Sequence, residues 1–185
     1  PGTDVATAFA RGCAAVGLAP VPGYRTTEVP EQDWVKRTQS QFTPIRVSTR
    51  LWVVPSWHAA PQESAISIVL DPGLAFGTGS HPTTRLCLDW LDRHLFPGSD
   101  VIDYGCGSGI LAIAAAKLGA GHVVGGDIDR QALAVSRYNA EQNRVVATFI
   151  GADAARPQPA DIVMANILSN PLKILAPLLA ALTVS

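Results

Sequence analysis

Residues 101–111 read VIDYGCGSGIL, an apolar run of strand length that breaks at three closely spaced glycines. The chain continues over 110–119 as ILAIAAAKLG, which predicts a helix closed by Gly119. Glycines at this spacing let the backbone turn tightly after a strand and lie against a ligand, and the next helix directs its first N–H groups to the same place. The stretch therefore predicts a strand, a ligand-binding turn and a helix.

An acidic residue follows at the distance expected in a nucleotide-binding fold. The apolar run His122–Gly126 predicts a second strand, and it leads into Asp127. Asp127 stands about 20 residues after the first glycine, where such folds place the carboxylate that binds ribose hydroxyls. A nicotinamide-dependent dehydrogenase is disfavoured, because Ile110 occupies the place of the third glycine of the dinucleotide fingerprint. A glycine-rich turn without a ligand is the remaining alternative.

Composition limits the class of protein. The chain has 185 residues and a net charge of -1, which suits one domain, or one domain with a small additional piece, and argues against binding nucleic acid by charge alone. It lacks an apolar run of about 18 residues and a secretory signal, so we expect no membrane span and no export. Cys13, Cys87 and Cys106 are scattered, which favours a reducing compartment without disulfides or a bound metal.

The N-terminal third predicts smaller elements. A helix is expected over 4–18 with Asp4 as its cap, then a weak strand over 24–29, and a polar linker helix over 31–41. One helix and one strand cannot enclose a core. The predicted parts are therefore 1–30, the end of a small α+β domain; 31–60, a linker helix and β segments (45–47 and 51–54); and 61–185, an α/β domain truncated at its C-terminus. Because the chain lacks an initial Met and ends just after a predicted helix, we interpret it as an excerpt of a longer protein.

A second motif covers residues 71–84, DPGLAFGTGSHPTT, which follow an apolar strand predicted over 65–70. Ser80 or His81 before Pro82 predicts a helix start, and the helix is expected to run to about Leu95. Phe76 is an aromatic side chain in a loop that should be polar, and a histidine with two threonines at a helix N-terminus suits a carboxylate group. An ordinary loop and helix cap is the alternative. The expected apolar face of this helix comprises Leu86, Cys87, Trp90, Leu91 and Leu95.

The remaining chain predicts further strands that end in polar residues. Asp129 is expected to cap a helix that ends at Gln142 and packs through Leu133, Val135 and Tyr138. The strand over 147–150 leads to Asp153, a candidate for the adenine edge or a plain loop acid. The strand over 161–165 leads to Asn166, a site candidate or a turn residue, and Ser169 or Asn170 is expected to cap the last helix. This order of elements predicts a parallel α/β sheet.

Motifs 71–84 and 101–111, with Ala165-Asn166-Ile167-Leu168, resemble the ribosomal protein methyltransferase family called PrmA. The similarity covers roughly 31–182, and motif 71–84 is far more specific than the glycine loop, which all class I methyltransferases share. The resemblance implies an α/β, Rossmann-like class I methyltransferase sheet whose C-terminal strands are missing, preceded by the end of a small α+β domain.

The resemblance also implies chemistry and partners. S-adenosylmethionine would donate methyl groups to amino groups (lysine side chains and the N-terminal amine) of a large-subunit ribosomal protein, in the cytoplasm, and we expect a monomer with no direct nucleic-acid or membrane contact. Another methyltransferase, or a cofactor-binding fragment without turnover, is the alternative. The residues implied to bind the cofactor are Thr84, Gly105, Gly107, Gly109, Asp127 and Asn166, with Asp153 as the adenine candidate. The residues expected near the chemistry are Asn166, Phe76 and His81, the last as a base or simply as a helix cap.

Overall fold

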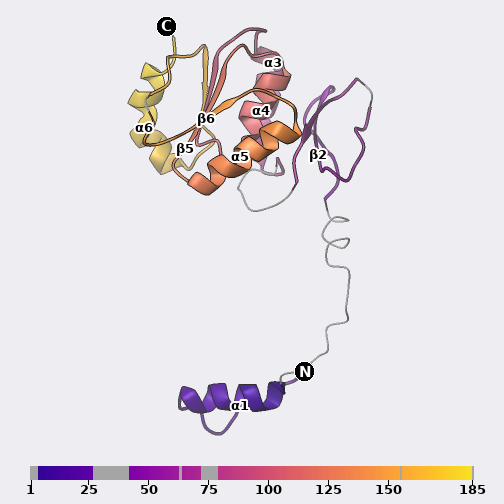
Figure 1. Cartoon of the computed structure of the whole chain (residues 1–185), viewed down its shortest axis with the longest axis vertical. Coiled ribbons are helices and arrows are strands. Elements are labelled where there is room, and N and C mark those ends of the chain that lie inside the picture. The colour runs from indigo at the N-terminus through magenta and orange to yellow at the C-terminus, as the bar shows by residue number, and fades with distance from the viewer. Residues whose placement is uncertain (1–3, 27–41, 63, 72–78, 155, 185) are drawn as a thin grey trace. The chain divides into compact units, whose positions relative to one another are not determined.

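The computed structural model describes residues 4–26, 42–62, 64–71, 79–154 and 156–184. The chain forms two compact units, Pro1–Arg37 and Thr38–Ser185, and Figure 1 shows the elements of each. The predicted linker helix over 31–41 lies outside the described residues.

Within its described residues, 4–26, the first unit forms the helix α1 (Val5–Ala15). Asp4 caps it as predicted, because its Oδ1 accepts a hydrogen bond from the Ala6 N–H at 3.1 Å. The strand predicted over 24–29 does not form in its described part, Tyr24–Thr26, where the ring of Tyr24 instead lies 4.6 Å from that of Phe9. A strand needs a partner to pair its backbone groups, and no described segment of this unit supplies one.

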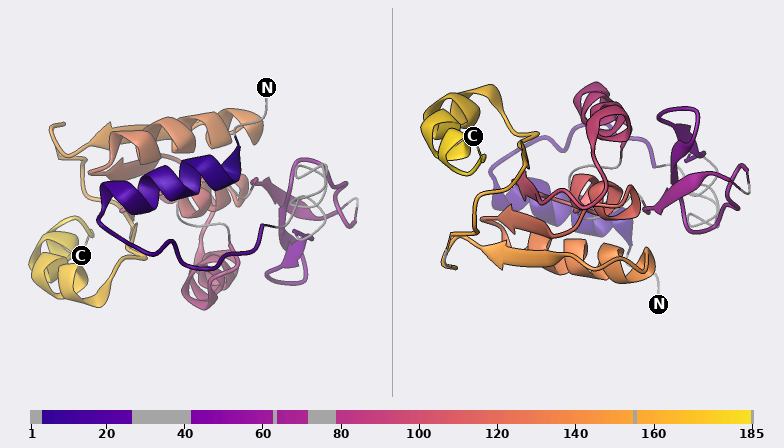
Figure 2. Two further views of the ribbon diagram at one scale, coloured as in Figure 1. Left: turned by 90° about the horizontal axis from the view of Figure 1, so that it is seen from below. Right: turned by 90° about the horizontal axis from the view of Figure 1, so that it is seen from above.

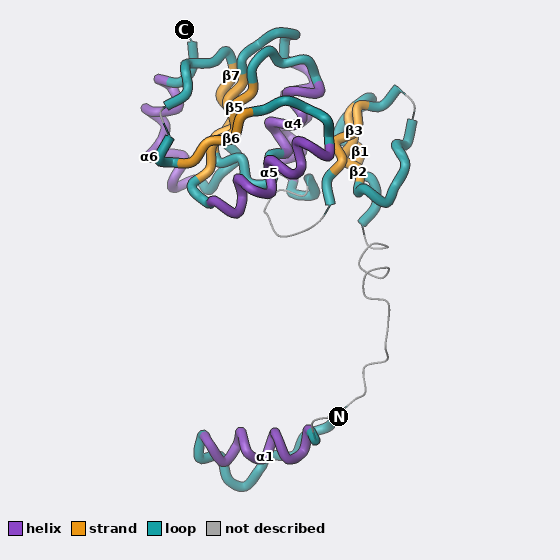
Figure 3. The backbone as a smooth tube through the Cα atoms, viewed as in Figure 1, coloured by secondary structure: helices purple, strands orange, loops and turns teal. Residues whose placement is uncertain are grey.

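The second unit is built on a four-stranded parallel sheet (Figure 3). Its strands are β4 (Val101–Tyr104), β5 (Val123–Asp127), β6 (Thr148–Gly151) and β7 (Ile162–Met164), in the spatial order β6-β5-β4-β7. The predicted parallel α/β sheet is therefore confirmed. Because all four strands run the same way, the residues that follow them meet at one edge of the sheet.

Helices connect and cover these strands. They are α3 (Pro82–His94), α4 (Ile110–Lys117), α5 (Arg130–Gln142) and α6 (Ser169–Ala181). The first six residues of α4 are all buried, so this helix forms the centre of the core. None of the described helices combines the length and apolar character needed to cross a membrane.

A smaller sheet precedes the parallel one. Its strands are β1 (Ile45–Arg46), β2 (Leu51–Val54) and β3 (Ile66–Val69); β1 runs antiparallel and β3 parallel to β2. Leu51 and Ile68 are fully buried in the same core as Ile113 of α4. The predicted boundary between parts 31–60 and 61–185 therefore falls between β2 and β3, which pair with each other. Figure 2 shows this sheet and α6 at opposite ends of the unit.

The expected apolar face of α3 was right for Cys87, Leu91 and Leu95, which pack in the core, and wrong for Leu86 and Trp90. Thr84, Leu88 and Leu91 are buried, whereas Leu86 is 69% and Trp90 44% exposed. The true stripe follows positions i, i+4 and i+7, and it was missed because its first member is a polar threonine. Trp90 instead stacks on His94 at the surface, with ring centroids 4.9 Å apart.

Two details of the later helices also differ. In α5, Tyr138 is exposed while Ser136 and Asn139 are buried, because the neighbouring glycine loop provides partners for polar groups on that face. At α6, the N-cap is Leu168 and no side chain caps the helix, since the helix already begins at Ser169. The caps predicted for α3 and α5, His81 and Asp129, are confirmed.

Candidate functional site

The glycine loop connects β4 to α4 at the edge where the parallel strands end. Gly105, Gly107 and Gly109 have φ angles of 76°, 53° and 77°. These left-handed values are costly for residues with a Cβ atom. The N–H groups of Gly105 and Cys106 both donate to the Gly126 carbonyl, at 2.7 and 3.0 Å. The turn is therefore held by backbone bonds to β5 and requires glycine.

Neighbouring side chains leave no space for a Cβ atom in this loop. A Cβ at Gly105 would lie 2.4 Å from Cγ2 of Ile167, and one at Gly109 would lie 2.9 Å from Cβ of Ser136. Ile167 directly follows Asn166, so the loop is packed against the turn that carries another expected site residue. The structure thus brings Gly105 and the Asn166 turn together.

Asp127, at the end of β5, organises the loop through its carboxylate. Its Oδ2 accepts from the Gly107 N–H and its Oδ1 from the Asp129 N–H, both at 2.9 Å. A carboxylate offers about four acceptor positions, so roughly two remain for ligand hydroxyl groups. Asp127 is partly exposed, which leaves those positions open to a ligand.

Asp103 lies beneath the loop and is almost completely buried, with 1% exposure. Burial raises its pKa to about 7, with a smaller contribution from the nearby charge of Asp127. The Ala112 N–H donates to Asp103 Oδ2 at 3.1 Å and opposes this rise. The motif contained this aspartate, but the sequence did not indicate that its charge would be buried under the glycines.

Thr84 and Asn166 meet although 82 positions separate them. The Asn166 Nδ2 donates to Thr84 Oγ1 at 3.0 Å, and Thr84 is 2% exposed in the first turn of α3. This bond orients the Asn166 amide, because one N–H is committed to Thr84 while Oδ1 accepts no hydrogen bond from the described residues. Together with Gly105 and Asp127, the pair surrounds the edge of the sheet at β4, β5 and β7.

His81 serves as the N-cap of α3. Its Nδ1 accepts from the Thr83 N–H at 3.3 Å and lies 2.8 Å from Thr83 Oγ1. With Nδ1 in this acceptor role, the ring could take up a proton only by giving up the cap. The geometry therefore favours the cap over the base among the two roles considered for His81.

The structure gives less support to two other predicted site residues, Asp153 and Phe76. Asp153 is highly exposed, and its Oδ2 lies 3.8 Å from a guanidinium nitrogen of Arg130, a weak surface ion pair. Phe76 lies outside the described residues, as do Gly77 and Thr78. Gly79, at φ 79°, follows them, and a Cβ atom there would lie 3.1 Å from Val53 Cγ2 and 3.2 Å from Ile110 Cδ1.

The sequence did not predict a role for two amides on α5. Asn139 is buried and donates from Nδ2 to the Ser108 carbonyl of the glycine loop at 2.9 Å. Asn143, the C-cap residue of α5, is buried as well. The sequence signal that could have indicated their burial is their i, i+4 spacing on the helix face that also carries Ala132, Leu133 and Ala140.

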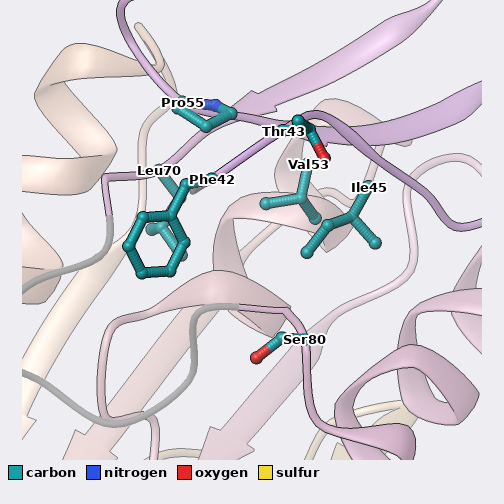
Figure 4. A pocket seen from close by; sticks show the side chains of 7 residues that line it. All are labelled: Phe42, Thr43, Ile45, Val53, Pro55, Leu70 and Ser80. Atoms are coloured by element: carbon teal, nitrogen blue, oxygen red, sulfur yellow. The ribbon is translucent and has the colours of Figure 1, made fainter. Parts of the chain in front are cut away.

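A small cavity lies between the β1–β2–β3 sheet and Ser80 (Figure 4). Its volume is about 20 Å³, enough for roughly one water molecule and far too small for a nucleotide. The residues that line it are Phe42, Thr43, Ile45, Val53, Pro55, Leu70 and Ser80. The candidate ligand site is therefore the open edge of the parallel sheet, where the glycine loop lies.

The strand order, the glycine turn after β4 and the carboxylate after β5 define a class I, Rossmann-like methyltransferase fold. Solved structures agree. A ribosomal protein L11 methylase from Lactobacillus delbrueckii subsp. bulgaricus is 35% identical, with a TM-score of 0.71 over 77% of this chain and 76% of that one. A magnesium protoporphyrin IX methyltransferase from Synechocystis PCC 6803, solved with bound SAH, is 28% identical, with a TM-score of 0.50 over 61% of this chain and 58% of that one.

The chain belongs to the ribosomal protein L11 methyltransferase (PrmA) family, whose model matches residues 6–185. A relative of that name from Dechloromonas aromatica is 59% identical over 98% of this chain. Another, from Cupriavidus necator, is 58% identical over 96% of it. The chain spans 61% and 59% of the length of these two relatives.

Proposed function

We propose that the second unit forms the cofactor-binding and catalytic part of an S-adenosylmethionine-dependent protein methyltransferase. Its acceptors would be amino groups of ribosomal protein L11, both lysine side chains and the N-terminal amine. Family membership supports this proposal. The observation that carries it is the Asn166–Thr84 hydrogen bond beside Gly105, because it assembles residues from three distant segments at one edge of the sheet.

The residues present fit the cofactor. Asp127 retains acceptor positions for two ribose hydroxyls after binding the Gly107 and Asp129 N–H groups. Gly105, Gly107 and Gly109 would lie against its methionine part, Thr84 and Asn166 would border it, and Asp153 is proposed for the adenine edge. When bound, S-adenosylmethionine supplies an electrophilic methyl group on a sulfonium.

The protein's contribution to methyl transfer is positioning of a neutral amine. A lysine has a reference pKa of about 10.4, so the site must favour its uncharged form. Asn166 can position the amine with Oδ1, which accepts an amine N–H while Nδ2 stays bonded to Thr84. Phe76 is proposed to desolvate the amine. Because His81 caps α3, we assign it a structural role and not that of the base.

The proposal includes a setting for the activity. The partner would be the ribosomal protein itself, without direct contact to nucleic acid or membrane, in the cytoplasm and as a monomer. The net charge of -1 supports recognition of a protein substrate over binding of nucleic acid by charge. A methyltransferase with another acceptor, or a chain that binds the cofactor without turnover, is the alternative function.

Calorimetric titration with S-adenosylmethionine, and separately with a nicotinamide dinucleotide, tests the cofactor assignment. We expect binding of the first alone, and roughly tenfold weaker binding by Asp127→Asn, which loses charge-assisted hydrogen bonds to the ribose. Asp127→Ala is less informative, because it also removes the bonds to Gly107 and Asp129. Binding of the dinucleotide would overturn the proposal. Methylation of unmethylated ribosomal protein L11 then tests the acceptor.

A further inference from the structure

Asn143 pairs with the open edge of the smaller sheet. The Ile66 N–H at the start of β3 donates to the carbonyl of Arg50, just before β2, and the Leu70 N–H, just after β3, donates to the carbonyl of Val54 at the end of β2. The backbone groups of successive residues in a parallel strand point alternately to the two sides of the strand. The N–H and carbonyl groups of Val69 therefore point away from β2, toward the open edge of the sheet. There the Val69 N–H donates to Asn143 Oδ1 at 2.8 Å, and Asn143 Nδ2 donates to the Val69 carbonyl at 2.7 Å. The side-chain amide takes the place of a missing neighbouring strand.

The same amide is connected to the glycine loop. Asn143 Nδ2 also donates to the main-chain carbonyl of Asn139 at 2.8 Å, and Asn139 Nδ2 donates to the Ser108 carbonyl at 2.9 Å. A continuous series of hydrogen bonds thus runs from Ser108 through one turn of α5 to Val69. We call this series the amide relay, formed by Ser108, Asn139, Asn143 and Val69.

Ordinary helix capping does not explain this arrangement. Asn139 and Asn143 are 8% and 5% exposed, and burying two amides is unfavourable unless each is hydrogen-bonded. Asn139 uses its side chain to bond the glycine loop, and Asn143 uses its side chain to bond β3 in addition to the Asn139 carbonyl in the last turn of its own helix. Asn143 needs a donor and an acceptor on one planar group, which an aspartate cannot provide. The side-chain amides of Asn139 and Asn143 therefore connect α5 to the glycine loop and to β3.

The relay joins the two halves of the proposed site. One end is the glycine loop, where Gly109 follows Ser108 directly. The other end is the start of motif 71–84, since Asp71 stands two residues after Val69 and binds the N–H and hydroxyl of Ser56 at 2.7 and 2.8 Å. The far end of that motif carries Thr84, which holds Asn166. Hydrogen bonds thus connect the Ser108 carbonyl to Val69, two residues before that motif begins.

We propose that Asn139 and Asn143 are positioning residues, which couple cofactor binding at the glycine loop to the placement of the end of β3. This inference rests on the proposed function for its cofactor part. A contiguous set of bonds alone does not demonstrate coupling, so the test must perturb one end and observe the other.

The experiment measures amide hydrogen exchange at Val69 by NMR. Asn139→Ala removes only the bond to Ser108 and leaves both Asn143–Val69 bonds, so a change at Val69 reports transmission. Gln142→Ala is the matched control, because it removes an exposed amide from the same turn of α5. Without cofactor, we expect Asn139→Ala to speed exchange at Val69 about fivefold, the equivalent of one buried hydrogen bond, and Gln142→Ala to leave it unchanged.

With saturating S-adenosylmethionine, exchange at Val69 should slow in the unmodified protein and in Gln142→Ala, but not in Asn139→Ala. Equal slowing in Asn139→Ala, or none in a cofactor-bound unmodified protein, would overturn the relay. If the cofactor does not bind at all, the proposed function fails, while the measurement without cofactor still decides whether the relay transmits. Asn143→Ala should raise the KM for the protein substrate more than the Kd of the cofactor, a split that general destabilisation would not produce.

Discussion

The glycine loop and the Thr84–Asn166 pair lie at the same sheet edge but are built differently. The loop and Asp127 come from one β-turn-α-β segment, and their contacts are largely backbone bonds and charges. The pair depends on a single bond between two neutral side chains that lie 82 residues apart. A loop of this kind responds to changes in backbone conformation and pH, whereas the pair responds to side-chain truncation.

Gly105→Ala should have the largest effect, since it strains the loop and displaces the Asn166 turn together. A left-handed φ and a Cβ 2.4 Å from Ile167 should cost about 3 kcal/mol, or more than a hundredfold in cofactor affinity measured by calorimetry. Gly98→Ala has a similar φ of 86° but open space around it, so it isolates the conformational cost. Adding Ile167→Ala should recover the steric part; no recovery would contradict the contact.

Asn166→Ala should act on turnover more than on cofactor binding. Loss of the aligned amide should lower kcat on the order of 100-fold, the scale of a 1 Å misplacement, with little change in cofactor Kd. Thr84→Val tests the pair from the other side, because it removes the acceptor of the same bond. If the two substitutions combine additively in a double-mutant cycle, the bond does not position Asn166.

Asp103→Asn should change the pH dependence of stability. The raised pKa of Asp103, about 7, means that the folded state keeps a proton that the unfolded state releases near pH 4. The free energy of unfolding should therefore fall by about 2 kcal/mol between pH 5 and pH 7, and Asp103→Asn should remove this loss. Urea unfolding at both pH values measures it. Asn166→Ala, which removes no ionisable group, should keep the slope of the unmodified protein.

His81→Ala should have the smallest effect. Loss of the cap should cost about 1 kcal/mol of stability in urea unfolding and leave the pH profile of kcat in place. His81→Asn, which retains a capping acceptor, should restore the stability. Loss of an acidic limb from the profile of His81→Ala would instead assign the ring as the base.

Much of the fold was predictable because its signals are local. The strands that begin near Val101 and Val123, the glycine turn, and the caps His81 and Asp129 follow from residues within one or two turns of each other. Two helices show that hydrophobicity alone does not predict burial. Both α4 and α6 are apolar, yet six residues of α4 are buried and none of α6. Hydrophobicity indicates which segments can be buried, while their neighbours determine which are.

The candidate site likewise combines residues that local sequence signals predict with contacts that only the tertiary structure shows. Gly105 and Asp127 could be assigned from the chain alone, because left-handed turns require glycine and the βαβ spacing places an acid beside the loop. From the chain alone, Thr84 and Asn166 were only candidates with an ordinary loop or turn as the alternative, and resemblance to a family assigned them to the cofactor. Their hydrogen bond, the burial of Asp103 and the amide relay through Asn139 and Asn143 came from the tertiary structure. Polar side chains acquire such roles only when distant segments pack together and exclude the water that would otherwise satisfy them.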